Sequence, residues 1–410
     1  MRVRLFILAA LLTGAAVAQL PVPRVGVPQL PVQVPVPGAA RLDPVLATVT
    51  RARALRVERL FNEHRAELDR SPPGDLILRA QVVGIDLTDE ALTRVTSAKF
   101  VVLRTQDLPE LQMKITVLQT PEGMSATQGL KRLRKLDPEG TYDYNHVYLD
   151  SAAETASDTP ATEAKQKVIY SGTGRIGLID GGVDASHEVF EGIRIHHYGC
   201  EDQVVPSPHG TAVAHLLISH NGIGEIFAAD VYCGQAFGGA LDAVSAAFGW
   251  MARERVAVIN VSLVGPRNKL MERVVKALVA RGHVIVAAVG NDGPAAPPLY
   301  PASYDGVIGV TAVDAKHRVL IEACRGKQVD FAAQGSDFEA AAGAPKIYVP
   351  VRGTSFAAPI IAAMFAMDLQ APDPAQAQIA LTKWKGTAHD LGKPGRDDVY
   401  GEGELIGPGL

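Results

Sequence analysis

Four short segments in the second half of the chain hold polar side chains that together could perform acyl transfer. Along the chain these are Asp180 in LIDGG, His209 in PHGTA, Asn291 in VGNDG and Ser355 in GTSFA. A serine hydroxyl attacks an amide carbonyl when a histidine takes its proton and a carboxylate orients that histidine. An amide N–H donor stabilises the oxyanion that forms, and one such donor is worth about 3 kcal/mol in the transition state. These residue types therefore indicate amide hydrolysis through an acyl-enzyme.

Each segment also has an ordinary structural explanation when it is taken alone. An Asp-Gly pair after a strand is more often a turn, and a single histidine at a helix start is more often structural or exposed. A serine before a helix is more often an N-cap. The joint occurrence of the four segments, in the order Asp, His, Asn, Ser, is what favours a catalytic site.

The elements around these residues predict one α/β domain. Short apolar runs, RIGLI, VAVINVSL, VIVAAV and VIGVTAV, alternate with helical stretches, as in a parallel sheet that is buried on both faces. Asp180 and Asn291 follow two of these runs, so both should lie at the carboxyl edge of the sheet, where open α/β folds place their sites. His209 and Ser355 each open an apolar helix, whose dipole favours negative charge there. Pro359 should fall in about the first turn of the second helix, where its missing N–H does least harm.

Residues 42–150 have the pattern of a smaller α+β unit. From residue 76 onward the order is strand, helix, two strands, helix and strand, which is that of a ferredoxin-like unit. Thr88 and Ser125 are suited to cap its two helices. Before it, apolar residues recur at roughly helical spacing from Leu42 to Arg70, which predicts a surface helix. The basic stretch LKRLRKL favours an amphipathic helix with a solvated face over a nucleic-acid site.

The remaining segments indicate export and processing. Residues 1–18 combine two arginines, a short apolar run and a small-residue end, which is typical of a signal peptide. Residues 19–41 are rich in Pro and Val and predict an extended linker. Residues 151–170 are small and polar, which predicts a linker open to proteolysis. We therefore expect a secreted or periplasmic protein whose last domain spans residues 171–410.

Composition excludes several other classes of function. The 410 residues carry a net charge of −4 at pH 7, so no basic field would attract nucleic acid or an anionic membrane. The apolar runs are too short to cross about 30 Å of hydrocarbon, which argues against a membrane anchor. We expect a monomer that uses no cofactor and no metal. Cys200, Cys233 and Cys324 are the three cysteines, so at most one disulfide can form within the chain.

Together the four segments resemble those of the subtilases, the subtilisin-like serine peptidases. That family has a strand ending in Asp-Ser/Thr-Gly, then His-Gly-Thr, Ala-Gly-Asn and Gly-Thr-Ser-Met/Phe-Ala-Ala-Pro. The matching segments here are Asp180-Gly181-Gly182, His209-Gly210-Thr211, Val289-Gly290-Asn291 and Gly353-Thr354-Ser355-Phe356-Ala357-Ala358-Pro359. The resemblance covers most of residues 172–368. It implies a subtilisin-like three-layer α/β fold with a mainly parallel sheet, preceded by a ferredoxin-like α+β propeptide domain.

The resemblance implies a role for each residue of the four segments. Ser355 would be the nucleophile, and His209 would be the general base and then the general acid. Asp180 would orient the imidazole and stabilise its protonated form. Asn291 would share the oxyanion with the backbone N–H of Ser355.

Polypeptide substrates would, by the same resemblance, bind as an added strand. The substrate-binding residues implied in this way are Ser262, Leu263, Val264, Ala288, Gly290 and Leu299. Val264 and Leu299 are branched residues at positions where the family commonly has glycine. We therefore expect a small pocket for the residue before the cleaved bond, with a preference for short side chains such as that of Ala.

The family's propeptide implies that the protein is made as a zymogen. Residues 42–150 would assist folding and inhibit the cleft until self-cleavage within residues 151–170. The segments IRIHHYGC and ADVYC map onto neighbouring strands of the subtilase sheet, which implies a Cys200–Cys233 disulfide and a free Cys324. The connection SHNGIGEIFA is too short for the family's calcium-binding loop, so we expect no calcium there.

Two positions depart from the family pattern, and three other assignments fit less well. Gly181 replaces a hydroxyl residue, which would remove a hydrogen bond to Asp180, and His215 stands where the helix usually has glycine.

An α/β-hydrolase would require GxSxG and the order Ser, Asp, His. A sedolisin has an acid in place of His209. The alternative from a different class is a catalytically inactive binding protein on the subtilase fold.

Overall fold

The computed structural model describes residues 54–151, 162–163, 171–219, 222–342 and 346–407. The expected signal peptide, the Pro-rich linker and most of the expected processing linker lie outside these residues. In the part of the chain that is described, no helix combines the length and the apolar character needed to cross a membrane.

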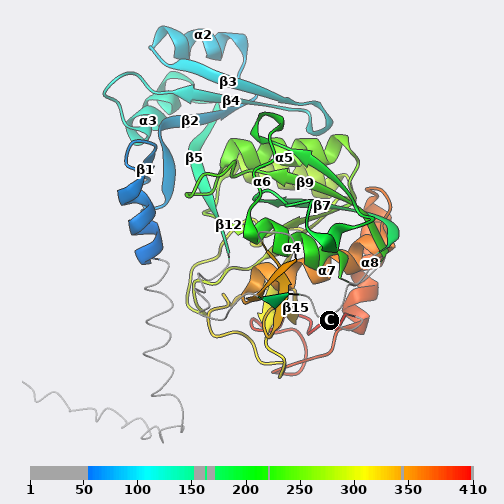
Figure 1. Ribbon diagram of the computed structural model, residues 1–410. Helices are drawn as coiled ribbons and strands as arrows, with labels where there is room; N and C mark the ends of the chain where they lie inside the picture. The colour runs from blue at the N-terminus through cyan, green and yellow to red at the C-terminus, as the bar shows by residue number, and fades with distance from the viewer. Residues whose placement is uncertain (1–53, 152–161, 164–170, 220–221, 343–345, 408–410) are drawn as a thin grey trace, which may run out of the picture. The chain divides into compact units, whose positions relative to one another are not determined.

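The C-terminal domain is built around a seven-stranded parallel sheet in the order β15-β14-β13-β11-β7-β9-β8 (Figure 1). Its strands are β7 (Gly172–Asp180), β8 (Arg194–Tyr198), β9 (Gly222–Asp230), β11 (Val258–Val261), β13 (Val284–Ala288), β14 (Val307–Val313) and β15 (Phe331–Gln334). Strands β8 and β9 lie on one side of β7, and the later strands lie on the other. The strand order therefore reverses at β7, which places Asp180 at the kind of edge where α/β folds bind ligands.

Two helical layers cover the two faces of this sheet. The helices are α4 (Pro208–Ile218), α5 (Leu241–Arg253), α6 (Lys269–Ala280), α7 (Thr354–Asp368) and α8 (Pro374–Thr387). Leu178 and Val258 pack with the buried residues of α4 and α7, whereas Ile179 and Ile259 pack with those of α5 and α6. Alternate residues of each strand thus enter different cores, which explains why the strands appear as continuous apolar runs in the sequence. A small antiparallel sheet adds β6 (Thr162–Glu163), β16 (Phe338–Ala341) and β17 (Ile347–Val351).

The N-terminal unit has the strand-helix-strand-strand-helix-strand order that the sequence predicts. Its elements are β2 (Leu76–Ile85), α2 (Asp89–Ser97), β3 (Val101–Leu108), a short 3-10 helix (Pro109–Leu111), β4 (Met113–Gln119), α3 (Ala126–Leu136) and β5 (Thr141–Asp150). The strands pair antiparallel in the order β5-β2-β4-β3. The Thr88 hydroxyl accepts from Ala91 N–H, and Ser125 forms a reciprocal capping box with Gln128, so both expected caps are confirmed.

Strand β5 also pairs with two short strands of the C-terminal domain. Its end lies antiparallel to β10 (Gly239–Ala240) and β12 (Leu263–Val264). The register joins Val147 and Tyr148 to β10, and Leu149 and Asp150 to β12. The last residues of the N-terminal unit are therefore an added strand in the C-terminal domain.

The predicted surface helix from Leu42 to Arg70 is wrong at its C-terminal end. A helix covers residues 54–63, and β1 (Leu68–Arg70) then pairs antiparallel with β2. Leu68 is fully buried opposite Leu78. Strand pairing at the edge of β2 buries this leucine, and apolar spacing along a charged stretch does not distinguish that outcome from a longer helix. Residues 42–53 lie outside the described residues.

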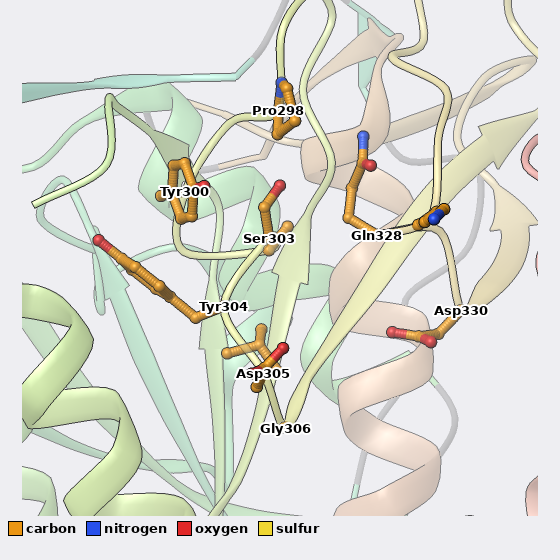
Figure 2. Close-up of a pocket in the computed structure, with 11 residues that line it drawn as sticks. Pro298, Tyr300, Ser303, Tyr304, Asp305, Gly306, Gln328 and Asp330 are labelled. Atoms are coloured by element: carbon orange, nitrogen blue, oxygen red, sulfur yellow. The ribbon is translucent and has the colours of Figure 1, made fainter.

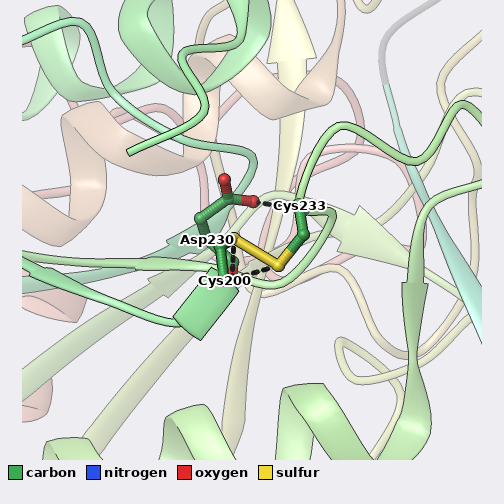
Figure 3. A group of neighbouring side chains, drawn as sticks. All are labelled: Cys200, Asp230 and Cys233. Atoms are coloured by element: carbon green, nitrogen blue, oxygen red, sulfur yellow. Dashed lines mark hydrogen bonds between the residues drawn. A yellow bond between two sulfur atoms is a disulfide. The ribbon is translucent and has the colours of Figure 1, made fainter. Parts of the chain in front are cut away.

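The expected disulfide is present between Cys200 and Cys233, whose Cα atoms are 5.1 Å apart (Figure 3). Cys200 follows β8 and Cys233 follows β9, and these two strands are neighbours in the sheet. The Cys233 N–H donates to Asp230 Oδ1 at 2.9 Å, which ties the second cysteine to the end of β9. Cys324 is buried and forms no disulfide, so the expected pairing is confirmed.

Candidate active site

Asp180 and His209 form a hydrogen-bonded pair at the carboxyl edge of the sheet. Asp180 is the last residue of β7 and is fully buried, and its Oδ1 lies 2.8 Å from His209 Nδ1. The same oxygen accepts from Gly181 N–H at 2.7 Å. His209 is the second residue of α4, which Ser207 caps by accepting from Gly210 N–H. The strand end and the helix start therefore hold the carboxylate against one nitrogen of the imidazole.

The second imidazole nitrogen of His209 is available. His209 Nε2 is buried and has no hydrogen-bond partner among the described residues. Burial lowers the pKa of His209, but the charge of Asp180 and its hydrogen bond outweigh burial and leave that pKa above its usual value. An imidazole with Nδ1 fixed by a carboxylate and Nε2 unpaired has the arrangement needed to accept a proton.

Ser355 is the second residue of α7, and its hydroxyl lies at the end of β5. Its Oγ lies in very close contact with the Oγ of Ser151 and 3.4 Å from the carbonyl oxygen of Ser262. Because Ser355 is near the helix N-terminus, its own N–H has no acceptor within the helix. The hydroxyl is directed to Ser151 and Ser262, so its hydrogen bond to His209 Nε2 is not made in this arrangement.

Pro359 lies inside α7, in its second turn instead of the first turn that the sequence predicts. A residue at this position would normally donate its N–H to the carbonyl four residues earlier, that of Ser355, and proline has no N–H. The hydroxyl of Ser262 donates to this carbonyl instead, at 3.1 Å. Because Pro359 leaves this carbonyl without a partner in the helix, the bond from Ser262 can join the helix of Ser355 to the segment that carries β12.

Asn291 follows β13 and presents an unpaired amide group. Its Oδ1 accepts from Thr354 N–H at 3.1 Å, whereas its Nδ2 is buried without a partner among the described residues. Thr354 also accepts from Gly290 N–H through its Oγ1, at 3.2 Å. These bonds fix Asn291 beside the start of α7 and leave its Nδ2 without an acceptor. An amide in this position could donate to an oxyanion that forms nearby.

The end of β5 occupies the strand position that the sequence assigns to substrate. Leu263 pairs with Asp150, and Val264 pairs with Leu149. Beyond the pairing, Ser151 N–H donates to Ser262 O at 3.2 Å, and the Ser151 hydroxyl donates to the same oxygen at 3.3 Å. Three of the predicted substrate-binding residues therefore bind a segment of the chain itself, and that segment reaches the hydroxyl of Ser355 at Ser151.

Predicted pocket residues come together around Gly290. A Cβ atom placed on Gly290 would lie 2.5 Å from Leu299 Cδ1, 3.3 Å from Cys324 Sγ and 3.6 Å from Val264 Cγ1. All three side chains are buried. Ala288 is also buried, but it packs in the other core, with α4 and α7, so its side chain does not join this wall.

Two of the residues in this site were not among those predicted from the sequence. Cys324 completes the wall beside Gly290, and its N–H donates to Gly290 O at 2.9 Å. Ser151 was assigned to the linker, although it lies against Ser355. Both depend on contacts between distant parts of the chain, and neither carries a local pattern that would have revealed it.

The two departures from the family pattern have clear structural consequences. The Oδ2 of Asp180 has no partner among the described residues, as expected with glycine at position 181. A Cβ on Gly181 would lie only 2.7 Å from that of Ser207, so the helix cap fills the available space. His215 is buried, accepts from Ala341 N–H at 3.1 Å, and has a pKa lowered to about 4 by burial. It is a neutral structural residue.

A hollow of about 320 Å³ is lined by residues between Pro298 and Val307 and by Lys327, Gln328 and Asp330 (Figure 2). Tyr300, Tyr304, Asp305 and Asp330 line it, and none of the four predicted catalytic residues does. The Asp330 carboxylate is already bonded to Gly309 N–H and to Arg396.

Within the described ranges, one cluster of potential metal ligands is formed by Cys200, Asp230 and Cys233 (Figure 3). The two sulfur atoms are bonded to each other, so they are not thiolate ligands.

Comparisons with known proteins agree with this geometry. The model of the subtilase family matches residues 173–403, more than half of the chain. Minor extracellular protease Epr of Bacillus subtilis is 32% identical over 206 residues, which are 48% of this chain and 32% of Epr. Subtilisin DY of Bacillus licheniformis is 28% identical over 251 residues, which are 56% of this chain and 87% of subtilisin DY.

Among solved structures, fervidolysin from Fervidobacterium pennivorans, described as a keratinolytic enzyme related to subtilisin, superposes with a TM-score of 0.65. The identity is 19%, and the match covers 80% of this chain and 60% of fervidolysin. This chain thus spans about a third of the length of Epr and less than two thirds of that of fervidolysin. The likeness to fervidolysin confirms the expected three-layer fold with a mainly parallel sheet.

Proposed function

The chain belongs to the subtilase family, and we propose that it is a secreted serine endopeptidase that is made as a self-processing zymogen. Asp180, His209 and Ser355 form its catalytic triad, and Asn291 donates to the oxyanion. The observation that carries the proposal is the position of Ser151, whose side chain contacts the hydroxyl of Ser355 while its backbone N–H is bonded to Ser262.

The reaction begins when the Ser355 hydroxyl turns from Ser262 O toward the unpaired Nε2 of His209. His209 takes the proton as Ser355 Oγ attacks the carbonyl carbon, and Asp180 stabilises the imidazolium through the bond at Nδ1. The oxyanion is stabilised by Asn291 Nδ2 and Ser355 N–H. His209 then gives the proton to the leaving amine, and water hydrolyses the acyl-enzyme by the same steps in reverse order.

The first substrate is the chain itself, and the bond that follows Ser151 is the one cleaved. The register of β5 on β12 makes Ser151 the residue before that bond, preceded by Asp150, Leu149 and Tyr148. Serine is a short side chain, which agrees with the small pocket formed beside Gly290. Until it is released, the N-terminal unit inhibits the enzyme by filling the position of a polypeptide substrate.

Other polypeptides bind in the same way once that segment has left. Tyr148 indicates a second point of recognition, because its side chain is fully buried and its hydroxyl donates to Pro266 O at 3.3 Å. A Cβ on Gly265 would lie 2.6 Å from the Tyr148 ring, so glycine is what leaves room for it. We therefore propose endopeptidase activity on extended segments, with secretion directed by residues 1–18 and the mature enzyme acting as a monomer.

A fluorophosphonate probe tests the catalytic assignment, because it labels only an activated serine. We expect labelling of the matured protein and none of the Ser355→Ala variant. Ser186→Ala is the matched control, since this exposed serine bonds to Asp184 and lies outside the proposed site, and it should label normally. A wild-type chain that stays uncut and unlabelled would favour the alternative of an inactive binding protein.

A further inference from the structure

The helix over residues 54–63 lies against the strand that fills the cleft. Leu60 shares a buried apolar cluster with Val147 and Leu149 of β5. Phe237 of the C-terminal domain belongs to the same cluster. The centroid of its ring lies 5.2 Å from that of His64, which directly follows the helix, and the two rings meet edge to face. The helix therefore packs on the inserted strand and on the domain that receives it.

Arg56 of this helix binds the residue next to Ser151. Its guanidinium makes two parallel hydrogen bonds to the Asp150 carboxylate, Nη1 to Oδ1 at 2.9 Å and Nη2 to Oδ2 at 2.8 Å. Nη1 also lies 3.3 Å from the backbone carbonyl oxygen of Asp150. The two side chains are only 18% and 22% exposed. Arg56 thus holds both the side chain and the backbone of the residue before Ser151, and a planar guanidinium is the group suited to that.

This ion pair also lies within electrostatic reach of His209. The negative charge of Asp150 raises the pKa of His209, and the positive charge of Arg56 lowers it, in addition to the larger effects of burial and of Asp180. The pair as a whole therefore places little net charge beside the imidazole, whereas either residue alone would change its protonation.

We propose that Arg56 is a positioning residue for self-cleavage after Ser151, and that after the cut it acts as a latch which retains the cleaved segment in the cleft. The proposal rests on the proposed function. Because Arg56 belongs to the segment that leaves, the latch is lost on release.

Refolding of the full-length chain tests the latch. The chain is diluted from denaturant, cleavage is followed by mass spectrometry, and the onset of activity is followed with a peptide substrate. In Arg56→Ala we expect cleavage to slow, and the delay between cleavage and activity to shorten, each by about threefold to tenfold for a partly buried two-bond pair. Asp150→Asn should have effects of similar size, and the double variant should add little to either single change.

A second readout separates positioning from mere stabilisation of the fold. The acid limb of the cleavage rate should move to higher pH in Arg56→Ala and to lower pH in Asp150→Asn, because the two charges act on His209 in opposite directions. Arg56→Lys keeps the charge, so it should restore the pH profile and part of the delay.

Arg70→Ala is the matched control, because Arg70 bonds to Glu58 of the same helix and not to Asp150. An equal effect of Arg70→Ala would overturn the proposal, and so would additive effects in the Arg56 and Asp150 variants or an acid limb that stays fixed in both. Failure of the proposed function has a different signature, because the wild-type chain itself would then remain uncut.

Discussion

Removal of Leu299 should enlarge the pocket for the residue before the cleaved bond. In the structure, Leu299 Cδ1 lies 2.5 Å from the position of a Cβ on Gly290, and Cys324 and Val264 close the same space at 3.3 and 3.6 Å. A Phe side chain would have to displace these atoms. Overpacking of this kind costs typically 1–3 kcal/mol, which corresponds to about tenfold to a hundredfold in kcat/KM.

The assay compares kcat/KM on peptides that keep the residues of the self-cleavage site and differ only at the position of Ser151. We expect the wild type to prefer Ala or Ser over Phe. Leu299→Gly should reduce that preference by about tenfold, because Cys324 and Val264 still restrict the space. Leu299→Ala should have a smaller effect, and Ile379→Ala, at an exposed residue of α8, should have none. A wild type that prefers Phe or Tyr over Ala would show that Leu299 and Val264 do not restrict this pocket.

Three further predictions concern the proton, the disulfide and the second recognition point. Self-cleavage should slow as pH falls through the raised pKa of His209, because only the neutral imidazole accepts the Ser355 proton; a rate that is flat from pH 5 to 9 would contradict this. Cys200 and Cys233 are 33 positions apart in the sequence, and the disulfide closes a loop that contains His209. Replacing both cysteines by Ser should lower the free energy of unfolding of the domain by about 3–4 kcal/mol and its Tm, measured by calorimetry, by roughly 10 °C. An unchanged Tm would show that the disulfide makes no such contribution. Tyr148→Ala should slow self-cleavage by at least tenfold, since truncation of a buried aromatic costs about 3–5 kcal/mol; equal cleavage rates in a time course would show that this pocket does not contribute.

Local sequence patterns were sufficient for much of the fold. Thr88 and Ser125 are caps because their side chains satisfy N–H groups at helix starts, and this requirement depends on neighbours in the sequence. Asp180 could be placed at the end of a buried strand because the short apolar run before it is typical of a sheet that is covered on both faces. The Cys200–Cys233 pairing could be expected because the order of strands in the family brings the two segments together.

Contacts between distant residues could not be predicted in this way. Arg56 and Asp150 are separated by 94 residues, and nothing in either local segment indicates the other. Leu68 fits a helical spacing as well as a strand, and only its pairing with β2 decides between them. Cys324 enters the pocket wall through the packing of its loop on Gly290. Tertiary packing fixes each of these residues, so propensity and periodicity are silent about them.

The most direct test of the central claim is the N-terminal sequence and mass of the refolded full-length chain, compared between the wild type and Ser355→Ala. We expect the wild type to yield a mature protein beginning at Ala152. The Ser355→Ala chain should stay uncut alone and should be cut at the same bond when active enzyme is added. Unaided maturation of Ser355→Ala to that N-terminus, or a wild-type cut at another bond, would contradict the assignment of Ser355 and Ser151.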